Sequence, residues 1–405
     1  MFEKIALKAE ILFKCSSIVY LFFGLYYFLN LPIGGGDESL FLSDLQLIKN
    51  IGWQEAIEKN ISIPYMLLTY PLSLIVDDFL ALRIVNVGLL VLLFLYFFYI
   101  SEVKTKTLYY YFLFFISTVG YFYFGTNDCL FFVSLIVFFN EVNNAVNNKN
   151  INFNLALTTL VIAFFTRQLF LVYLPIILLG LYILYRYEFK FSNRTFLPLG
   201  FIILFLILNI PSIEKNSTLS FDKKSPPKGL GVSWSQRQYL AQLMVNNGEI
   251  ENFNHPSWEQ TKAYIDKNGK SSLPDGILNG ITFDYQMTFK EFFKDFGYSI
   301  TYSGRALGLM LLITLGYWFR LLYKNRKVEL IYFIPFSTLL MLMIFSFIII
   351  SFVELRWLAP VFMMTIVYYF QLLEQKKISK YFILANSLVL CLLCFYGMFR
   401  MVQKI

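Results

Sequence analysis

The sequence contains few of the residues from which soluble enzymes usually build metal or nucleophilic sites. Its 405 residues include one histidine, His255, and four cysteines, all within or beside apolar runs: Cys15, Cys129, Cys391 and Cys394. No spacing of histidine, cysteine and carboxylate typical of zinc is present. We therefore expect neither a disulfide framework nor a cysteine-based metal site. The Cys391-x-x-Cys394 pair is interpreted as packing and His255 as a surface or capping residue.

Charged residues are also scarce. They make up 15% of the chain, whereas hydrophobic residues make up 58%, and the mean hydropathy is +0.60. The sequence has no P-loop, no dinucleotide-binding fingerprint and no Ser-His-Asp spacing, so chemistry driven by a cytoplasmic nucleotide is not indicated. The first apolar run, 11–31, is too long for the core of a signal peptide and is expected to be retained.

Apolar runs recur along nearly the whole chain, and each is long enough to cross about 30 Å of hydrocarbon. The pattern predicts an all-α polytopic membrane protein with about 11 transmembrane helices. The apolar stretch 63–76 is broken by Pro64 and Pro71, so we expect a re-entrant or interfacial helix there. The expected spans are 11–31, 79–100, 107–125, 128–142, 151–166, 169–186, 195–211, 303–323, 330–350, 357–373 and 381–399.

The net charge of +8 follows from topology rather than from a nucleic-acid partner. With the N-terminus in the cytoplasm, the inner segments contain an excess of Lys and Arg, and the outer segments are nearly neutral, as the positive-inside rule requires. Three regions follow: an N-terminal transmembrane bundle, 1–211, with a first outer loop at 32–78; a water-soluble outer loop, 212–302; and C-terminal transmembrane helices, 303–405. Residues 288–296 are amphipathic and predict a helix on the membrane surface.

In this topology, ionisable residues gather at the outer surface. They are Asp37, Glu38, Arg83, Asp128, Arg167, Glu354 and Arg356. Charges so close to the hydrocarbon are costly and usually mark function. A carboxylate can act as general base on a hydroxyl, and the planar guanidinium of arginine matches phosphate oxygens. The mixture therefore favours sugar transfer from an isoprenoid phosphate to a hydroxyl acceptor.

Structural interpretations of the same residues remain open. Arg83 could bind an acidic partner on a neighbouring helix, Asp128 could cap its span, and the other charges could anchor outer turns. A divalent metal (Mg, Mn or Zn) held by Asp37 and Asp128, with Glu354 as another candidate acid, is compatible with the residues but not required. In the soluble loop, Trp234 and Arg237 are the candidates for the acceptor side.

Three segments resemble the GT-C membrane glycosyltransferases, in particular the branch of protein-O-mannosyltransferases and lipid A aminoarabinose transferases. These segments are Gly34-Gly35-Gly36-Asp37-Glu38, Ala81-Leu82-Arg83-Ile84-Val85-Asn86 and Glu354-Leu355-Arg356-Trp357-Leu358-Ala359-Pro360. The resemblance implies that Asp37 is the catalytic base with Glu38 in support, and that Asp128 is a second acid near the donor. It implies that Arg356 holds the donor phosphate, although Leu355 separates Glu354 from Arg356 in a way the family motif does not. Arg167 and Arg83 are candidates for binding the same phosphate because of their charge and their position in the predicted topology.

Two other functions are kept as alternatives. An O-antigen-type polymerase or ligase acting on a lipid-pyrophosphate glycan would depend on Arg237 and His255 in the large loop. A non-enzymatic lipid or solute transporter would place charges near the middle of the membrane and show internal symmetry. The expected partners are a polyprenyl-phosphate-linked sugar, a glycan, lipid or protein acceptor, and the bilayer. The bias toward Phe, Ile, Lys and Asn places the protein in a bacterial inner membrane.

Overall fold

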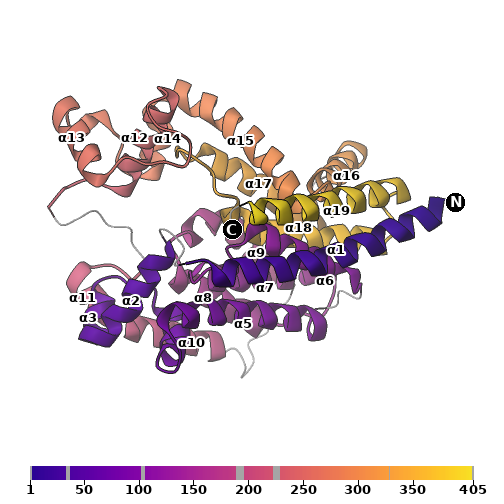
Figure 1. The fold of residues 1–405 in the computed structure, drawn as a ribbon, viewed down its shortest axis with the longest axis horizontal. Helices are drawn as coiled ribbons and strands as arrows, with labels where there is room; N and C mark the ends of the chain where they lie inside the picture. The colour runs from indigo at the N-terminus through magenta and orange to yellow at the C-terminus, as the bar shows by residue number, and fades with distance from the viewer. Residues whose placement is uncertain are drawn as a thin grey trace. The chain divides into compact units, whose positions relative to one another are not determined.

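The computed structural model describes residues 2–32, 37–101, 105–187, 196–221, 229–327 and 329–403, and all its regular elements in these ranges are helices (Figure 1). Gly34, Gly35 and Gly36 lie outside the described residues. The helices are α1 (Phe2–Asn30), α2 (Asp37–Ile51), α3 (Trp53–Glu58), α4 (Ile63–Ser73), α5 (Asp78–Tyr99), α6 (Thr107–Val119), α7 (Asp128–Val146), α8 (Phe153–Thr166), α9 (Phe170–Arg186), α10 (Phe196–Leu208), α11 (Ile210–Asn216), α12 (Trp234–Asn246), α13 (Trp258–Asn268), η2 (Lys270–Ser272), α14 (Ile277–Phe283), α15 (Tyr285–Leu307), α16 (Met310–Asn325), η3 (Leu330–Tyr332), α17 (Phe333–Phe347), η4 (Leu355–Leu358), α18 (Ala359–Glu374) and α19 (Lys380–Val402).

The helices agree with a polytopic membrane protein, but the expected count of eleven spans is not confirmed. In the part of the chain that the structure describes, six helices are long and apolar enough to cross a membrane, or up to eight if each of two bent pairs is one span. The bent pairs are α10 with α11 and α15 with α16, and α6, α8 and α9 are apolar but shorter. The shortfall arises where the apolar runs are interrupted, because a helix of 13 or 14 residues extends only about 20 Å.

The chain divides into two compact units. Unit 1 comprises 1–222, 304–338 and 359–405, and unit 2 comprises 223–303 and 339–358. These bounds differ from the three regions expected from the sequence, because the C-terminal part of α17 and the turn after it group with the large polar loop. The physical reason is visible in the core of unit 2, where Ile349 packs with Tyr239, Leu240, Ile265 and Met287.

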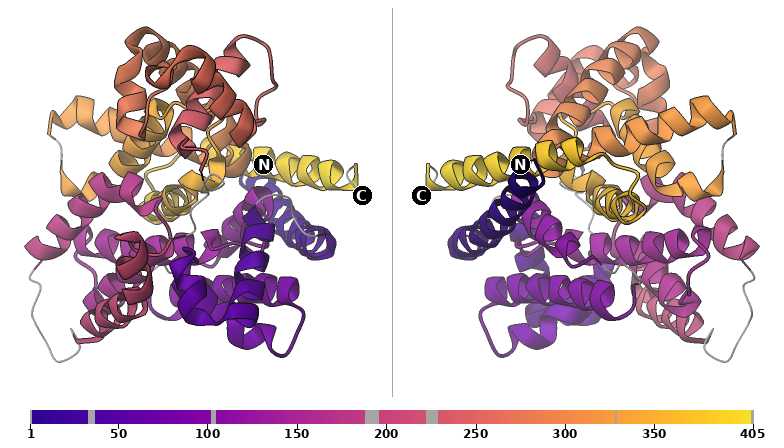
Figure 2. Two further views of the ribbon diagram at one scale, coloured as in Figure 1. Left: turned by 90° about the vertical axis from the view of Figure 1, so that its left-hand side faces the viewer. Right: turned by 90° about the vertical axis from the view of Figure 1, so that its right-hand side faces the viewer.

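Unit 1 is built around α7, whose side chains are all buried. Helices α5, α8, α9 and α18 pack against it, and α1 packs against α6 and α19 (Figures 1 and 2). Close packing of α1 on α19 depends on Gly397, because a Cβ there would overlap the Tyr20 ring. A helix buried on all sides with an apolar sequence is the arrangement expected in a transmembrane core.

The break between α15 and α16 combines a glycine conformation with a contact from a distant part of the chain. Gly308 has a φ of +56°, a conformation that costs a residue with a side chain extra energy. The backbone N–H of Leu309 donates a hydrogen bond to the Asn386 side chain at 2.8 Å, which satisfies a donor freed by the break. The two helices then differ in direction by 116°.

Two expected surface helices are present as helices. The stretch predicted to be re-entrant or interfacial forms α4, which contains Pro71 and is followed by exposed Leu74 and Ile75. The amphipathic stretch 288–296 lies within α15, where Phe289 and Phe293 are exposed while Glu291 is buried. Helices α12, α13 and α14 of unit 2 gather in one group (Figures 1 and 2).

Candidate functional site

Glu38 and Arg83 form a buried ion pair in unit 1. Arg83 Nε donates to Glu38 Oε1 and Nη2 to Oε2, both at 2.7 Å, so the contact is bidentate. The Glu38 side chain is 2% exposed and the Arg83 side chain is 0% exposed. Glu38 lies in the first turn of α2, where the helix N-terminus favours a negative charge. The pair fixes the start of α2 against α5.

Arg83 also terminates α1. Its Nη1 donates to the carbonyl oxygens of Phe28, Leu29 and Leu31, at 2.9–3.1 Å. The last carbonyls of a helix have no partners within the helix, and a cation there is favourable. Because its guanidinium is buried and makes these contacts, Arg83 has a structural role: it binds an acidic partner on a neighbouring helix. The prediction that it binds a donor phosphate gains no support from this geometry.

The loop before α7 joins the same network. Gly125 N–H donates to Glu38 Oε1 at 2.8 Å, and Asn86, one turn after Arg83 on α5, donates to the carbonyl oxygens of Phe124 and, at 2.9 Å, Thr126. Gly125 has no room for a side chain, because a Cβ would lie 2.5 Å from Leu82 Cβ and 3.0 Å from Glu38 Oε1. The segment from Leu82 to Asn86 of α5 therefore positions both the chain at the end of α1 and the loop before α7.

Asp128 and Arg167 form a second ion pair next to the first. Asp128 opens α7 and is 1% exposed, whereas Arg167 follows α8 and is 15% exposed. Asn127 braces the pair by donating to Ser62 Oγ at 3.1 Å and to the Thr166 carbonyl oxygen at 3.0 Å. Thus Asp128 lies in the first turn of its helix, but its carboxylate mainly faces an arginine rather than capping the helix.

The structure thereby brings together Glu38, Arg83, Asp128 and Arg167 from four separate parts of the chain. Asp37, immediately before Glu38, is half-buried in the first turn of α2. The contacts run from Arg83 through Glu38 to Gly125. Gly125 lies in the loop that ends at Asp128, and Asp128 forms the ion pair with Arg167. Ser62, Asn86, Gly125 and Asn127 were not identified from the sequence, although the spacing Arg83-x-x-Asn86 places both side chains on one face of a helix.

Glu354 and Arg356 belong to unit 2 and form an ion pair with each other. Arg356 lies in η4 and is 5% exposed. Trp357 stacks on Phe345 with ring centroids 5.8 Å apart. The extra residue Leu355 does not prevent the acid and the arginine from meeting, because a tight turn returns Arg356 toward Glu354.

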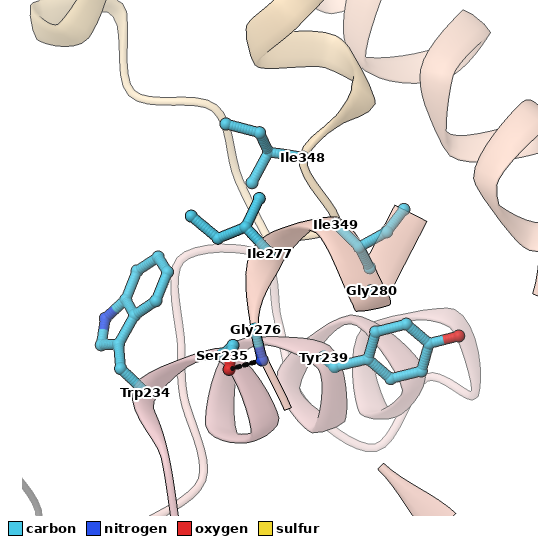
Figure 3. Close-up of a pocket in the computed structure, with 8 residues that line it drawn as sticks. All are labelled: Trp234, Ser235, Tyr239, Gly276, Ile277, Gly280, Ile348 and Ile349. Carbon is cyan, nitrogen blue, oxygen red and sulfur yellow. Dashed lines mark hydrogen bonds between the residues drawn. The ribbon is translucent and has the colours of Figure 1, made fainter. Parts of the chain in front are cut away.

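The two residues assigned to the acceptor side also lie in unit 2, and the structure gives them different surroundings. Trp234 lines a small hollow with Tyr239, Ile277 and Ile349, and its volume of about 10 Å³ leaves room for about one water molecule (Figure 3). Ser235 Oγ accepts a hydrogen bond from Gly276 N–H at the edge of this hollow.

Arg237 is held by its neighbours in unit 2. Its guanidinium lies 4.8 Å from the centroid of the Trp258 ring, and its Nε donates to the Pro256 carbonyl oxygen at 2.7 Å. Partial burial lowers the pKa of Arg237, while the nearby Glu259 carboxylate opposes that shift. His255 Nδ1 is 3.3 Å from Ser351 Oγ. The contact between His255 and Ser351 connects the large loop to the turn that precedes η4.

A metal at the predicted acids would compete with an arginine. Within the ranges described above, no group of three or more His, Cys, Asp or Glu side chains is arranged to hold a metal ion. Because Asp128 is the ion-pair partner of Arg167, a cation would have to displace or repel that guanidinium. The donor set at Asp128 therefore fits an arginine better than a divalent metal.

Comparison of the chain with models of protein families, with curated proteins and with solved structures found no match in any of the three.

Proposed function

We propose that this protein transfers a sugar from a polyprenyl-phosphate donor to a hydroxyl acceptor at the outer face of the membrane, with Asp37 as general base. One observation supports the proposal above all others. The acids Glu38 and Asp128 and the arginines Arg83 and Arg167 form one network, and Asp37 adjoins it.

Asp37 and Glu38 have distinct roles in the proposed reaction. Asp37 takes the proton of the acceptor hydroxyl while the hydroxyl oxygen forms a bond to the anomeric carbon of the sugar. The bond between that carbon and the phosphate oxygen breaks, and polyprenyl phosphate leaves. Glu38 does not react; its contacts to Arg83 and Gly125 hold the first turn of α2, and with it Asp37, in place.

Arg167 is the arginine of unit 1 assigned to the donor phosphate. It is partly exposed, whereas Arg83 is fully buried. A guanidinium has five N–H donors in a planar fork, so Arg167 can keep its contact to Asp128 and still donate to a phosphate. Its charge would stabilise the negative charge that develops on the leaving phosphate. The sequence-based assignment of Arg356 to the donor phosphate stays a prediction.

The test measures release of polyprenyl phosphate, a product that does not depend on the identity of the acceptor. The full-length protein in nanodiscs is incubated with undecaprenyl-phosphate-linked hexoses and with a membrane extract as the source of acceptor. We expect Asp37→Asn to lower the rate by about 100-fold or more, as for loss of a general base. Asp266→Asn, an exposed acid of α13 paired with Lys262, is the matched control and should retain the wild-type rate.

Wild-type turnover by the Asp37→Asn protein would contradict the proposal. A larger loss from Arg237→Ala than from Asp37→Asn would instead favour the polymerase or ligase alternative. For the donor site, Arg167→Lys should raise the KM for the donor more than it lowers kcat, because lysine keeps the charge but not the two-pronged geometry.

A further inference from the structure

Ser62 and Asn127 stand at the starts of two helices of unit 1 without capping them. They precede α4 and α7, a position where serine and asparagine side chains usually accept a hydrogen bond from their own helix. Neither side chain makes such a cap here. Asn152, at the start of α8, does so, because its side chain accepts from Leu155 N–H at 3.1 Å. The side chains of Ser62 and Asn127 are therefore used by another part of the structure.

Both side chains bind the last residue of α8. The Thr166 carbonyl oxygen accepts from Ser62 Oγ and from Asn127 Nδ2, each at 3.0 Å. Asn127 Nδ2 also donates to Ser62 Oγ at 3.1 Å, so the three groups close a ring of hydrogen bonds. All three residues are buried. The last carbonyl oxygens of a helix have no partners within that helix, and here α4 and α7 supply the donors.

Arg167 follows this carbonyl directly. Its backbone is extended, with φ −154° and ψ 137°, so the chain leaves the helical conformation at Arg167. Asn127 holds Thr166, and Asp128, the next residue of α7, forms the ion pair with Arg167. Two consecutive residues of α7 thus bind two consecutive residues at the end of α8. Arg167 is held through its guanidinium and through the peptide group that precedes it.

The ring of hydrogen bonds can affect a ligand only through Arg167. Both N–H groups of the Asn127 amide and the O–H of Ser62 are donated within the ring, and both side chains are buried. Arg167 is 15% exposed and can reach a ligand. An arginine whose backbone is already fixed loses less conformational freedom when it binds a phosphate, so fixing it in advance strengthens binding.

We infer that Ser62 and Asn127 are positioning residues for the donor phosphate: they hold Arg167 in the conformation that receives it. The inference rests on the proposed function, in which Arg167 binds the phosphate of the polyprenyl-phosphate donor. It assigns a role in that reaction to two residues that carry no charge and touch no substrate.

The first measurement reports the conformational freedom of Arg167 and does not depend on turnover. The full-length protein in nanodiscs is treated with phenylglyoxal, which modifies accessible guanidinium groups, and the modification of Arg167 is followed by peptide mass spectrometry. Exposed Arg186, at the end of α9, is the internal reference. We expect Ser62→Ala and Asn127→Ala each to raise the rate at Arg167 about three- to tenfold, because loss of one or two hydrogen bonds loosens Thr166. Ser62→Ala removes one hydroxyl group and is the milder of the two changes.

The second measurement reports binding of the phosphate. Native mass spectrometry of the full-length protein with undecaprenyl phosphate gives a dissociation constant, and undecaprenol, which lacks the phosphate, shows the contribution of the lipid chain. We expect Asn127→Ala to weaken binding of undecaprenyl phosphate about tenfold, because Arg167 must then be ordered on binding. Since Asn127 acts through Arg167, Asn127→Ala combined with Arg167→Ala should bind no more weakly than Arg167→Ala alone.

Asn140→Ala is the matched control for loss of a buried asparagine. Asn140 is also buried on α7, and its Nδ2 donates to Tyr96 Oη at 2.7 Å and to Ser101 Oγ at 3.2 Å. It lies about 20 Å from Asn127 along the helix axis. Both Asn127→Ala and Asn140→Ala should lower the thermal midpoint, whereas only Asn127→Ala should change the modification of Arg167 and the binding of undecaprenyl phosphate.

The outcomes separate this inference from the proposed function. Unchanged modification of Arg167 in Ser62→Ala and Asn127→Ala, or an equal change in Asn140→Ala, would overturn the inference. Weaker binding in Arg167→Ala with wild-type binding in Asn127→Ala would overturn the inference alone and leave the donor site in place. Wild-type binding in Arg167→Ala would contradict the proposed donor site and the inference with it, while the role of Asp37 is tested separately by the release of polyprenyl phosphate.

Discussion

Arg83 shows at the scale of a residue how this protein accommodates a charge inside its core. Burying a guanidinium is unfavourable unless its charge is paired and its N–H groups have acceptors. Here the carboxylate of Glu38 supplies the opposite charge and the end of α1 supplies carbonyl oxygens. The ion pair therefore holds the first turn of α2 in place as well as contributing to stability. Because Asp37 lies in that turn, the ion pair also positions Asp37.

We predict that Arg83→Ala is strongly destabilising because it leaves Glu38 buried without its counter-charge. The free energy of unfolding should fall by about 3–5 kcal/mol. Denaturant unfolding in detergent micelles, with Glu38→Ala and the double variant completing a thermodynamic cycle, would show coupling of about 2–3 kcal/mol. Additive effects of the two single changes would contradict the assigned contact.

A second prediction concerns the space at Gly125. Gly125→Ala should lower the free energy of unfolding by about 1–3 kcal/mol, because the new methyl group would overlap Leu82 and approach Glu38. Gly88→Ala on α5 is the matched control: no atom lies within 4 Å of a Cβ built there, and alanine favours a helix over glycine. The thermal midpoints of both variants test the difference, and equal midpoints would refute it.

At the scale of an element, α13 of unit 2 shows how a polar sequence specifies the residue at which a helix begins. Ser257 accepts from Gln260 N–H at 3.1 Å, and Gln260 Oε1 accepts from Ser257 N–H at 2.7 Å, which forms a capping box. Helix α12 begins in the same way at Ser233. Such starts are readable from a sequence because they depend on residues only three positions apart.

Glu259, in the first turn of α13, gives this element a dependence on pH. Hydrogen bonds from its own backbone N–H and from the Ser257 hydroxyl lower the pKa of Glu259 below its ordinary 4.5. Because the folded pKa is lower than the unfolded one, the stabilisation is complete above about pH 4.5 and disappears as the pH falls through the folded pKa. The unfolding midpoint of Glu259→Gln should lie below that of the wild type at pH 6, and the difference should shrink as the pH falls below about 4.5. A difference that does not shrink at acidic pH would exclude this cause.

At the scale of the whole molecule, the charge bias predicts the orientation. In a background whose four cysteines are replaced by serine, Asn268→Cys should react with a membrane-impermeant maleimide on intact spheroplasts. Gln375→Cys, which follows α18 on the predicted cytoplasmic side, should react only after permeabilisation. The opposite labelling pattern would show that the topology is inverted and that the proposed active site faces the cytoplasm.

The sequence by itself determined the helical class, the apolar segments and the set of candidate acids and arginines, because hydropathy, capping and charge bias act over short stretches of chain. The tertiary structure decided which charges meet. Glu38 lies 45 positions from Arg83, and Asp128 lies well apart from Arg167 along the chain, so no local pattern could pair them. It also decided where a helix breaks, since Gly308 and Asn386 set the break between α15 and α16 through a contact distant in sequence.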